Sequence, residues 1–170
     1  ALFDRANDVL GYDLTQVCFA GPEEELTKTE NAQPGIFLVS WVAQEVLKSQ
    51  STGLKFEAAA GLSLGEFTAL TAAGVMSFED GLKVVRQRGR FMQEACEATE
   101  GGMAAIIGLD EAATREVCSE ANVELANLNC PGQMVISGAS AGIERACELA
   151  KESGAKRALP CRWPARITRA

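Results

Sequence analysis

The fold of this chain is decided by one hexapeptide, Gly61-Leu62-Ser63-Leu64-Gly65-Glu66. An apolar run at 56–60 precedes it and an amphipathic stretch at 64–73 follows it, so the order predicts a strand, a tight turn and a helix. The pattern G-x-S-x-G at such a junction is typical of a nucleophile elbow, in which a sharp turn exposes the serine hydroxyl. We expect both flanking glycines to be needed because a Cβ would clash where the chain reverses. Ser63 is therefore the candidate nucleophile, and the alternative is a serine that only forms a turn.

The backbone N–H of Leu64 is the candidate oxyanion donor. It lies at the start of the expected helix, where free N–H groups and the helix dipole stabilise negative charge.

Composition narrows the class of protein. With 170 residues and 47% apolar side chains, the chain can be one globular domain or parts of two. The net charge of -7 argues against a nucleic-acid partner. No uninterrupted apolar stretch of about 18 residues and no signal peptide are present, so we expect a cytoplasmic protein without a membrane span. Because the chain begins at Ala1 inside a helical pattern, we also expect a preceding segment to be missing.

Six cysteines are dispersed along the chain, at positions 18, 96, 118, 130, 147 and 161. They form no C-x-x-C pair, and the chain contains no histidine that could complete a zinc site. We therefore expect buried, reduced thiols and no zinc site.

The charge is unevenly distributed. From Arg145 onward the net charge is +5, whereas residues 1–144 carry -12. This basic C-terminal quarter fits either contact with an acidic partner or a solvated helix face followed by an unusual tail.

Residues 1–60 predict mostly helices. Residues 1–10 have apolar spacing typical of a packing helix that ends at Gly11. A short helix should follow Pro22 and end near residue 27. Pro34 indicates a further start, and residues 36–47 are apolar almost all round, which predicts a helix buried on most sides. Gln33 precedes this helix and points either to the surface or into a site.

Arg88 lies in an unusual position on the next expected helix. Residues 77–80 read as a capping box for a helix that runs to about residue 98. Arg88 falls in the middle of its apolar face, which is formed by Val84, Val85, Phe91, Met92 and Ala95. A buried charge must be paired, so we expect a protein carboxylate or a ligand carboxylate beside Arg88, with a side chain that reaches the surface as the third alternative.

The pattern changes at Gly101, where we place a domain boundary. The following stretches predict strand, helix, strand, strand, helix and strand, at residues 103–108, 110–121, 123–128, 133–137, 140–153 and 155–159. The order βαββαβ predicts a ferredoxin-like unit.

Residues 1–160 resemble the malonyl-CoA:acyl-carrier-protein transacylase family, which includes the acyltransferase domains of fatty-acid and polyketide synthases. Besides the elbow, the matching stretches are Tyr12-Asp13-Leu14, Gly21-Pro22-Glu23-Glu24-Glu25-Leu26, Ala32-Gln33-Pro34, Arg88-Gly89-Arg90-Phe91-Met92-Gln93, Met103-Ala104-Ala105-Ile106-Ile107-Gly108 and Asn129-Cys130-Pro131-Gly132-Gln133. The resemblance implies that the chain is α/β. Residues 1–100 would form an incomplete α/β-hydrolase-like large domain, residues 101–161 a ferredoxin-like (βαββαβ) small subdomain, and residues 162–170 an atypical tail.

The resemblance also implies the roles of the site residues. The elbow serine, Ser63, would take the acyl group, and Arg88, 25 residues downstream, would bind the free carboxylate of malonate with its guanidinium fork. Gln33 would lie near the site. We therefore expect Ser63 and Arg88 to lie close enough for a three-carbon diacid to bridge them.

Two positions depart from the family pattern. Leu62 stands where the family usually has histidine, and the histidine that serves as general base after a segment like 155–160 is absent from this chain. A serine without an adjacent base is a poor nucleophile. We hypothesise that a one-base deletion in the gene replaced the base-bearing segment with residues 162–170, which requires the codon of Ile167 to end in C.

The family resemblance implies transfer of a malonyl group from malonyl-CoA to the phosphopantetheine thiol of acyl carrier protein, through an acyl-serine and without a metal or other cofactor. For this chain we expect little or no turnover, and for the complete protein a monomer. The alternatives are a serine hydrolase or thioesterase of α/β-hydrolase type and an inactive fragment that binds carrier protein. The sequence leaves open whether the parent is free-standing or a synthase domain. A large domain without later strands should leave an exposed sheet edge.

Overall fold

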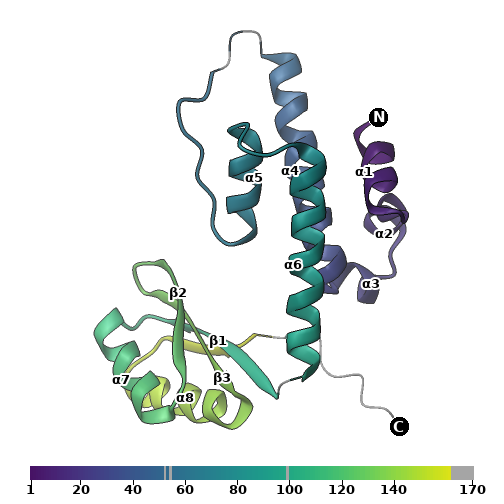
Figure 1. Cartoon of the computed structure of the whole chain (residues 1–170). Helices are drawn as coiled ribbons and strands as arrows, with labels where there is room; N and C mark the ends of the chain where they lie inside the picture. Colours follow the sequence, from purple (N-terminus) through teal and green to yellow (C-terminus); the bar gives the residue numbers. More distant parts are fainter. Residues whose placement is uncertain (52, 54, 99, 162–170) are drawn as a thin grey trace. The chain divides into compact units, whose positions relative to one another are not determined.

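The structure is a computed structural model that describes residues 1–51, 53, 55–98 and 100–161. The chain divides into two compact units, Ala1–Ala95 and Cys96–Ala170 (Figure 1). The first unit is helical and the second is an α/β sandwich, so the chain as a whole is α/β. In the part of the chain that the structure describes, no helix is both long and apolar enough to cross a membrane.

The helices of the first part of the chain follow one another with short connections, except between the fourth and the fifth, where residues 51–63 intervene. They are α1 (Leu2–Leu10), α2 (Leu14–Ala20), α3 (Glu23–Thr27), α4 (Thr29–Gln50), α5 (Leu64–Ala72) and α6 (Phe78–Ala98). Helix α1 ends as predicted at Gly11, whose φ of 72° is left-handed. The predicted start of α6 is confirmed, since Asp80 N–H donates to Ser77 Oγ over 3.1 Å. The sequence reading did not predict α2, which is capped by the side chain of Asp13.

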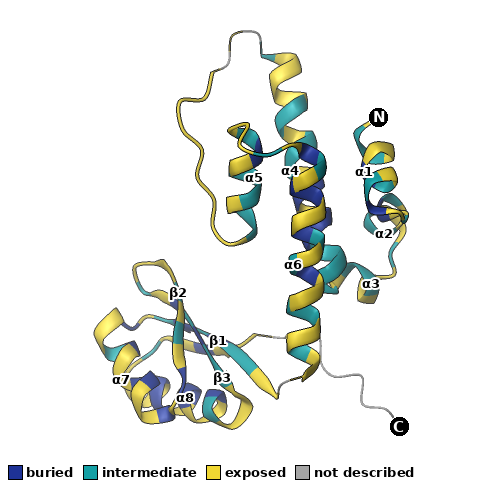
Figure 2. Cartoon of the chain, viewed as in Figure 1, coloured by how far each residue is buried: buried dark blue, intermediate teal, exposed yellow. Residues whose placement is uncertain are grey.

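The core of the first unit lies where α1, α2, α4 and α6 meet. Its buried members are Ala6, Leu10, Leu14, Phe37, Leu38, Phe78, Leu82 and Val85. Figure 2 shows buried stretches on α4 and α6, with further buried positions on α1 and α2. Gly81 makes the contact possible, because a Cβ there would lie 2.7 Å from Phe37 Cζ. The two longest helices are therefore held in close contact along one side of each.

Two expectations for α4 are wrong. The helix begins at Thr29, so Pro34 lies inside it rather than at its start. The helix is also not buried on most sides, because Ile36 is 58% exposed and Leu47 is 46% exposed. Only one side of α4 is covered by the core, and the opposite apolar side faces solvent.

The predicted strand at residues 56–60 is not formed. Every residue of the segment is exposed, and the segment has no regular secondary structure. A strand needs the backbone groups of a neighbouring strand as hydrogen-bond partners. The described residues of the first unit form no strand at all, so the expected sheet edge is absent as well.

The second unit has the predicted order βαββαβ. Its elements are β1 (Gly101–Ile107), α7 (Glu111–Ala121), β2 (Glu124–Cys130), β3 (Gln133–Ala139), α8 (Ser140–Glu152) and β4 (Arg157–Pro160). The four strands form an antiparallel sheet in the order β2-β3-β1-β4. Strand alternation places Ala104 and Ile106 of β1 beside Ile136 of β3 in one core with α7 and α8. Both helices therefore cover the same face of the sheet.

Candidate functional site

The elbow forms although its strand does not. Ser63 has φ 54° and ψ -109°, a left-handed backbone conformation that a residue with a Cβ rarely adopts. The Ser63 N–H donates to Glu66 Oε1 over 3.0 Å, and Gly65 N–H donates to the Leu62 carbonyl over 2.9 Å. These bonds hold the turn and leave the Ser63 side chain exposed. The contribution of Glu66 was missed, although a serine followed three residues later by glutamate is the signature of a capping box.

Only one of the two flanking glycines is required by space. A Cβ on Gly61 would overlap the carbonyl group of Gly65 and lie 2.5 Å from Glu66 N. A Cβ on Gly65 would meet nothing within 4 Å. The expectation that both glycines prevent a clash is therefore wrong for Gly65, because its Cβ direction points away from the reversal.

Arg88 reaches Ser63 directly. Its Nη2 donates to Ser63 Oγ over 2.7 Å, and its Nη1 donates to Gln33 Oε1. The structure thus brings together all three side chains that the sequence singled out. Ser63 and Arg88 lie well within the span of a three-carbon diacid, as expected.

Gln33 is held in one orientation. It is only 6% exposed, and its Nε2 donates to Met92 Sδ over 3.2 Å while its Oε1 accepts from Arg88. Because an amide has one acceptor and one donor end, these two contacts fix which end faces the guanidinium. Of the two alternatives for Gln33, the structure gives the buried one.

The surroundings of Arg88 are apolar but open. The Arg88 Cζ lies 5.8 Å from the centroid of the Phe67 ring, a cation–π distance. Beside it runs an open groove of about 470 Å³ whose lining includes Val84, Phe91 and Met92. Arg88 itself is half-buried, and among the described residues no carboxylate pairs with it. Its partners are the neutral oxygens of Gln33 and Ser63, so of the three alternatives the one with a protein carboxylate is not found among the described residues.

A close helix crossing supports this arrangement. A Cβ on Gly89 would overlap the carbonyl oxygen of Thr29 and lie 3.0 Å from Glu30 Cα. The Thr29 hydroxyl donates to the Gly89 carbonyl over 2.9 Å. The first turn of α4, which leads to Gln33, therefore rests directly on the turn of α6 that carries Arg88.

The candidate oxyanion donor is present in the chain, whereas the expected base is not. Leu64 is the first residue of α5, so its N–H has no acceptor within the helix. Leu62, at the position where histidine was expected, is 69% exposed. The chain contains no histidine, and the tail at 162–170 lies outside the described residues. Among the residues that are described, no cluster of His, Cys, Asp or Glu side chains is placed to hold a metal ion.

The thiols and the basic quarter lie away from Ser63 in the sequence. The six cysteines are free, and burial raises the pKa of Cys18, Cys118 and Cys147. Only Cys118 and Cys147 are buried, so the expectation of buried thiols is wrong for the other four. Arg145, where the basic quarter begins, pairs with Glu120 over 3.2 Å. Its role toward an acidic partner stays a prediction.

Comparison with known proteins agrees with the sequence resemblance. The malonyl CoA-acyl carrier protein transacylase of Bacillus subtilis (strain 168) is 52% identical over 164 residues, which are 94% of this chain and 51% of that protein. The solved acyl-carrier-protein S-malonyltransferase of Burkholderia pseudomallei 1710b superposes with a TM-score of 0.89 at 47% identity, over 95% of this chain and 53% of that one. A malonyl-transacylase in complex with its type II PKS acyl-carrier protein has a TM-score of 0.89 at 43% identity, over 95% of this chain and 53% of that one.

The chain spans about half the length of the curated relatives that it matches. Within the chain, residues 3–160 match the family described as acyl transferase domain. This match covers nearly the whole sequence and includes Ser63, Arg88 and Gln33, so the chain belongs to the acyl transferase domain family, together with the malonyl-CoA:acyl-carrier-protein transacylases that it resembles.

Proposed function

We propose that this chain carries the nucleophile and the carboxylate-binding group of a malonyl-CoA:acyl-carrier-protein transacylase. The observation that supports this most directly is the contact between Arg88 Nη2 and Ser63 Oγ at 2.7 Å. A guanidinium beside a serine nucleophile suits an acyl group that ends in a second carboxylate, because the fork can bind both carboxylate oxygens.

In the first half-reaction, the free carboxylate of malonyl-CoA takes the place of Ser63 Oγ and Gln33 Oε1 on the guanidinium of Arg88. This leaves Ser63 Oγ free to attack the thioester carbon. The Leu64 N–H, at the start of α5, stabilises the oxyanion of the tetrahedral intermediate. The C–S bond then breaks, CoA leaves as the thiol, and a malonyl ester remains on Ser63.

In the second half-reaction, the phosphopantetheine thiol of acyl carrier protein attacks the malonyl ester, and Ser63 regains its hydroxyl. One similar structure is a malonyl-transacylase in complex with its acyl-carrier protein, which supports this choice of acceptor. Both half-reactions need a base for the serine or thiol proton. Since the chain has no histidine, we expect its own acylation to be very slow.

The fold supports a more detailed assignment of both units. The antiparallel strand order β2-β3-β1-β4 with two helices on one face is that of a ferredoxin-like subdomain. The extended segment before a left-handed Ser63 and a following helix suits an incomplete α/β-hydrolase-like domain. We keep both as proposals, together with the domain limits at residues 100 and 161 and the cytoplasmic location.

The hydrolase or thioesterase alternative is not favoured. It needs the same elbow, but it provides no function for a guanidinium that contacts the nucleophile. An inactive fragment that only binds carrier protein likewise provides no reason for a buried glutamine that orients this guanidinium.

The test uses a chimera in which residues 1–160 replace the matching half of the Bacillus subtilis relative, which restores the missing length. Arg88→Ala should lower malonyl transfer to carrier protein by about 10- to 100-fold, since hydrogen bonds to charged groups contribute about 1.5–3 kcal/mol. Acetyl transfer should change by less than about threefold, because acetate has no second carboxylate to lose. Arg90→Ala is the matched control, since among the described residues Arg90 has one ion-pair partner, Glu94 at 3.6 Å, on an exposed part of α6.

Equal losses for malonyl and acetyl groups would show that Arg88 does not select the carboxylate. Faster release of malonate to water than to carrier protein would favour the hydrolase. For the chain by itself, intact mass after incubation with malonyl-CoA reports whether Ser63 becomes acylated.

A further inference from the structure

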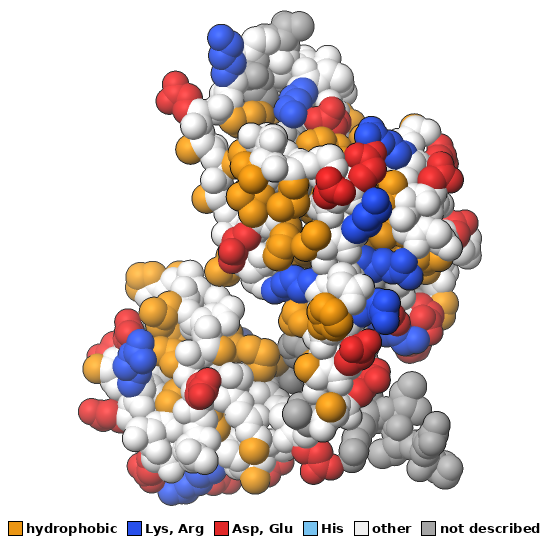
Figure 3. All heavy atoms as spheres, viewed as in Figure 1, with side chains coloured by type: hydrophobic (Ala, Val, Ile, Leu, Met, Phe, Trp, Pro, Cys, Tyr) orange, Lys and Arg blue, Asp and Glu red, His pale blue; other side chains and the backbone are white. Residues whose placement is uncertain are grey.

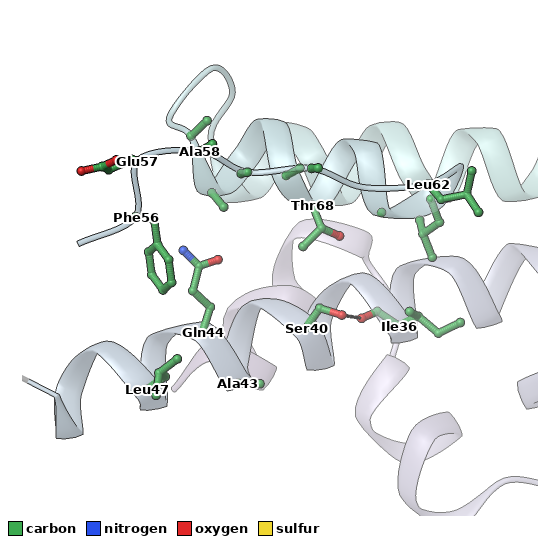
Figure 4. Close-up of a pocket in the computed structure, with 17 residues that line it drawn as sticks. Ile36, Ser40, Ala43, Gln44, Leu47, Phe56, Glu57, Ala58, Leu62 and Thr68 are labelled. Carbon is green, nitrogen blue, oxygen red and sulfur yellow. Dashed lines mark hydrogen bonds between the residues drawn. The ribbon is translucent and has the colours of Figure 1, made fainter. Parts of the chain in front are cut away.

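The hydrogen bonds that link α4 to α6 involve Thr29 and Gln33, which lie four positions apart on one face of α4. Farther along α4, Ile36 and Leu47 line an open pocket of about 980 Å³ (Figure 4). Ser40 also lines this pocket, and its hydroxyl donates within the helix, to the Ile36 carbonyl over 2.7 Å. The polar contacts at the start of α4 therefore fix its position along α6.

Gln93 of α6 makes one of these contacts, and no step of the proposed reaction uses it. Its Oε1 accepts from the Thr29 N–H over 3.3 Å and lies 3.1 Å from the Thr29 hydroxyl oxygen. The N–H groups in the first turn of a helix have no acceptor within the helix. Lys28, the residue before α4, provides no side-chain cap for them. Gln93 therefore caps α4 from a different helix.

This cap sets the register between the two helices. Thr29 contacts both Gly89 and Gln93. One turn farther along α4, Gln33 Oε1 accepts from Arg88 Nη1. A shift of α4 along its axis by one residue is about 1.5 Å, which is enough to break a hydrogen bond. The Thr29 contacts therefore keep Gln33 within reach of Arg88.

The guanidinium of Arg88 is in turn oriented by Gln33. While Gln33 holds Nη1, Nη2 donates to Ser63 Oγ over 2.7 Å. A group that is already oriented loses less freedom when its ligand binds. We propose that Gln93 is a positioning residue for malonyl binding, because its cap on α4 keeps the guanidinium of Arg88 directed at the nucleophile. For its effect on malonyl-CoA, this role rests on the proposed function.

The experiment compares two side chains of nearly equal length at position 93 in the chimera described above. Gln93→Met has no oxygen that can accept from Thr29, whereas Gln93→Glu keeps one, and its charge suits the positive end of a helix dipole. Figure 3 shows acidic and basic side chains interspersed over the first unit, so one further carboxylate does not create a field of one sign. The comparison therefore isolates the hydrogen-bond acceptor.

The two variants should differ in the KM for malonyl-CoA. Gln93→Met should raise this KM about tenfold and change kcat by less than about twofold, because the guanidinium is less well oriented before substrate binds. The KM for acetyl-CoA should stay within about twofold, since acetate has no second carboxylate. Gln93→Glu should bring the malonyl-CoA KM back to within about twofold of the parent value.

Gln50→Met is the matched control. It makes the same change at an exposed glutamine at the other end of α4. Both KM values should stay at those of the parent chimera.

A double variant tests the route of the effect. If Gln93 acts through Gln33, adding Gln93→Met to Gln33→Met should raise the malonyl-CoA KM by less than about twofold further. Additive effects would overturn the proposal, and so would equal losses for malonyl and acetyl groups from Gln93→Met. A Gln93→Glu variant as impaired as Gln93→Met would overturn it as well.

Hydrogen exchange in the chain by itself provides a readout that needs no turnover. The Thr29 amide should exchange about tenfold faster in Gln93→Met than in Gln93→Glu, because it loses its acceptor. Equal exchange rates would overturn the proposal. If Gln93→Met does not fold, Thr29→Val and Thr29→Ser take its place, since only the first removes the hydroxyl beside Gln93. Thr29→Val should then raise the malonyl-CoA KM about threefold, and Thr29→Ser should not.

A failure of the proposed function would give a different result. Arg88→Ala would then lower malonyl and acetyl transfer alike, and the effect of Gln93 on malonyl binding would fail with it. The exchange rate of the Thr29 amide would still decide whether Gln93 holds α4 in place.

Discussion

Arg88 Nη2 donates to Ser63 Oγ over 2.7 Å. The guanidinium of a residue 25 positions after Ser63 therefore contacts the candidate nucleophile directly. Such a contact stabilises negative charge on the serine oxygen, but it also occupies one of its lone pairs. A ligand carboxylate binds the guanidinium more strongly than a neutral hydroxyl does. We infer that the Ser63–Arg88 bond is the resting arrangement, which an acid-bearing substrate replaces.

The first prediction concerns the charge at position 33. Gln33→Glu keeps the size of the side chain but places a carboxylate on Arg88 Nη1, where it competes with the malonyl carboxylate. In the chimera, its malonyl transfer rate should fall about tenfold further than that of Gln33→Met, which is of similar volume and uncharged. Initial rates at several malonyl-CoA concentrations provide the measurement. If both variants lose the same activity, the amide of Gln33 only fills space.

The second prediction separates the two elbow glycines. Gly61→Ala forces a methyl group against the Gly65 carbonyl and should destabilise the chain by about 1–3 kcal/mol, as overpacking does. Gly65→Ala meets open space near the start of α5 and should be neutral or stabilising by up to about 1 kcal/mol. Urea unfolding followed by circular dichroism compares them. A loss at Gly65 as large as that at Gly61 would contradict the elbow geometry.

The third prediction concerns Tyr12, the only tyrosine of the chain. Burial raises its pKa from 10.0 to about 12, although the Arg86 guanidinium, 4.7 Å from the ring centroid, lowers it. Because the pKa is higher in the folded than in the unfolded chain, neutral Tyr12 stabilises the fold below pH 10, and this contribution is lost as the pH rises toward 12. An ultraviolet titration of the folded chain follows this one phenol, and Tyr12→Phe should abolish the signal. A midpoint at the ordinary value of a tyrosine would contradict its burial.

The fourth prediction orders the thiols. Burial raises the pKa of Cys118 and Cys147, so less reactive thiolate is present at a given pH, whereas Cys130 and Cys161 are exposed. Iodoacetamide at neutral pH should modify the exposed pair first, and the buried pair should follow only at higher pH or after unfolding. Peptide mass spectrometry at timed intervals measures the order. Early modification of Cys118 would mean that the second unit opens easily.

The second unit was predictable because its signals are local and complete. Alternating apolar residues in β1 and β3, helix spacing in α7 and α8, and turn residues between them all occur within about sixty residues. Each strand also finds its partner inside the same segment. The βαββαβ order was therefore correct, with strand ends displaced by about two residues.

The first unit was less predictable because its apolar patterns indicate segments that can be buried or paired, and the described residues do not provide the partners. The apolar run at 56–60 reads as a strand, but hydrogen-bond partners decide whether it becomes one. The apolar content of α4 likewise indicated burial on several sides, while the structure covers one. Hydrophobic periodicity reports which faces can be buried, and it cannot report whether a partner is present.

The candidate site was predictable in its residues and less so in its contacts. The elbow pattern indicated Ser63 and Leu64, the apolar stripe around Arg88 and the position of Gln33 before a helix made both candidates, and the family resemblance implied their roles. The neutral partners of Arg88 could not be read from the sequence, because they come from α4 and the elbow, 55 and 25 positions away. Met92 was counted only as part of an apolar stripe, although its sulfur accepts from Gln33.

The closeness of α4 and α6 at Gly89 has a consequence for how mutagenesis data on this chain should be interpreted. Any side chain at position 89 would push the backbone of Thr29 away and displace Gln33 with it. The hydrogen bond from Arg88 to the side-chain amide of Gln33 would then be lost. A scan that measures turnover alone would then score residue 89 as chemically essential. Gly89 would instead be important because its lack of a side chain lets the two helix backbones touch.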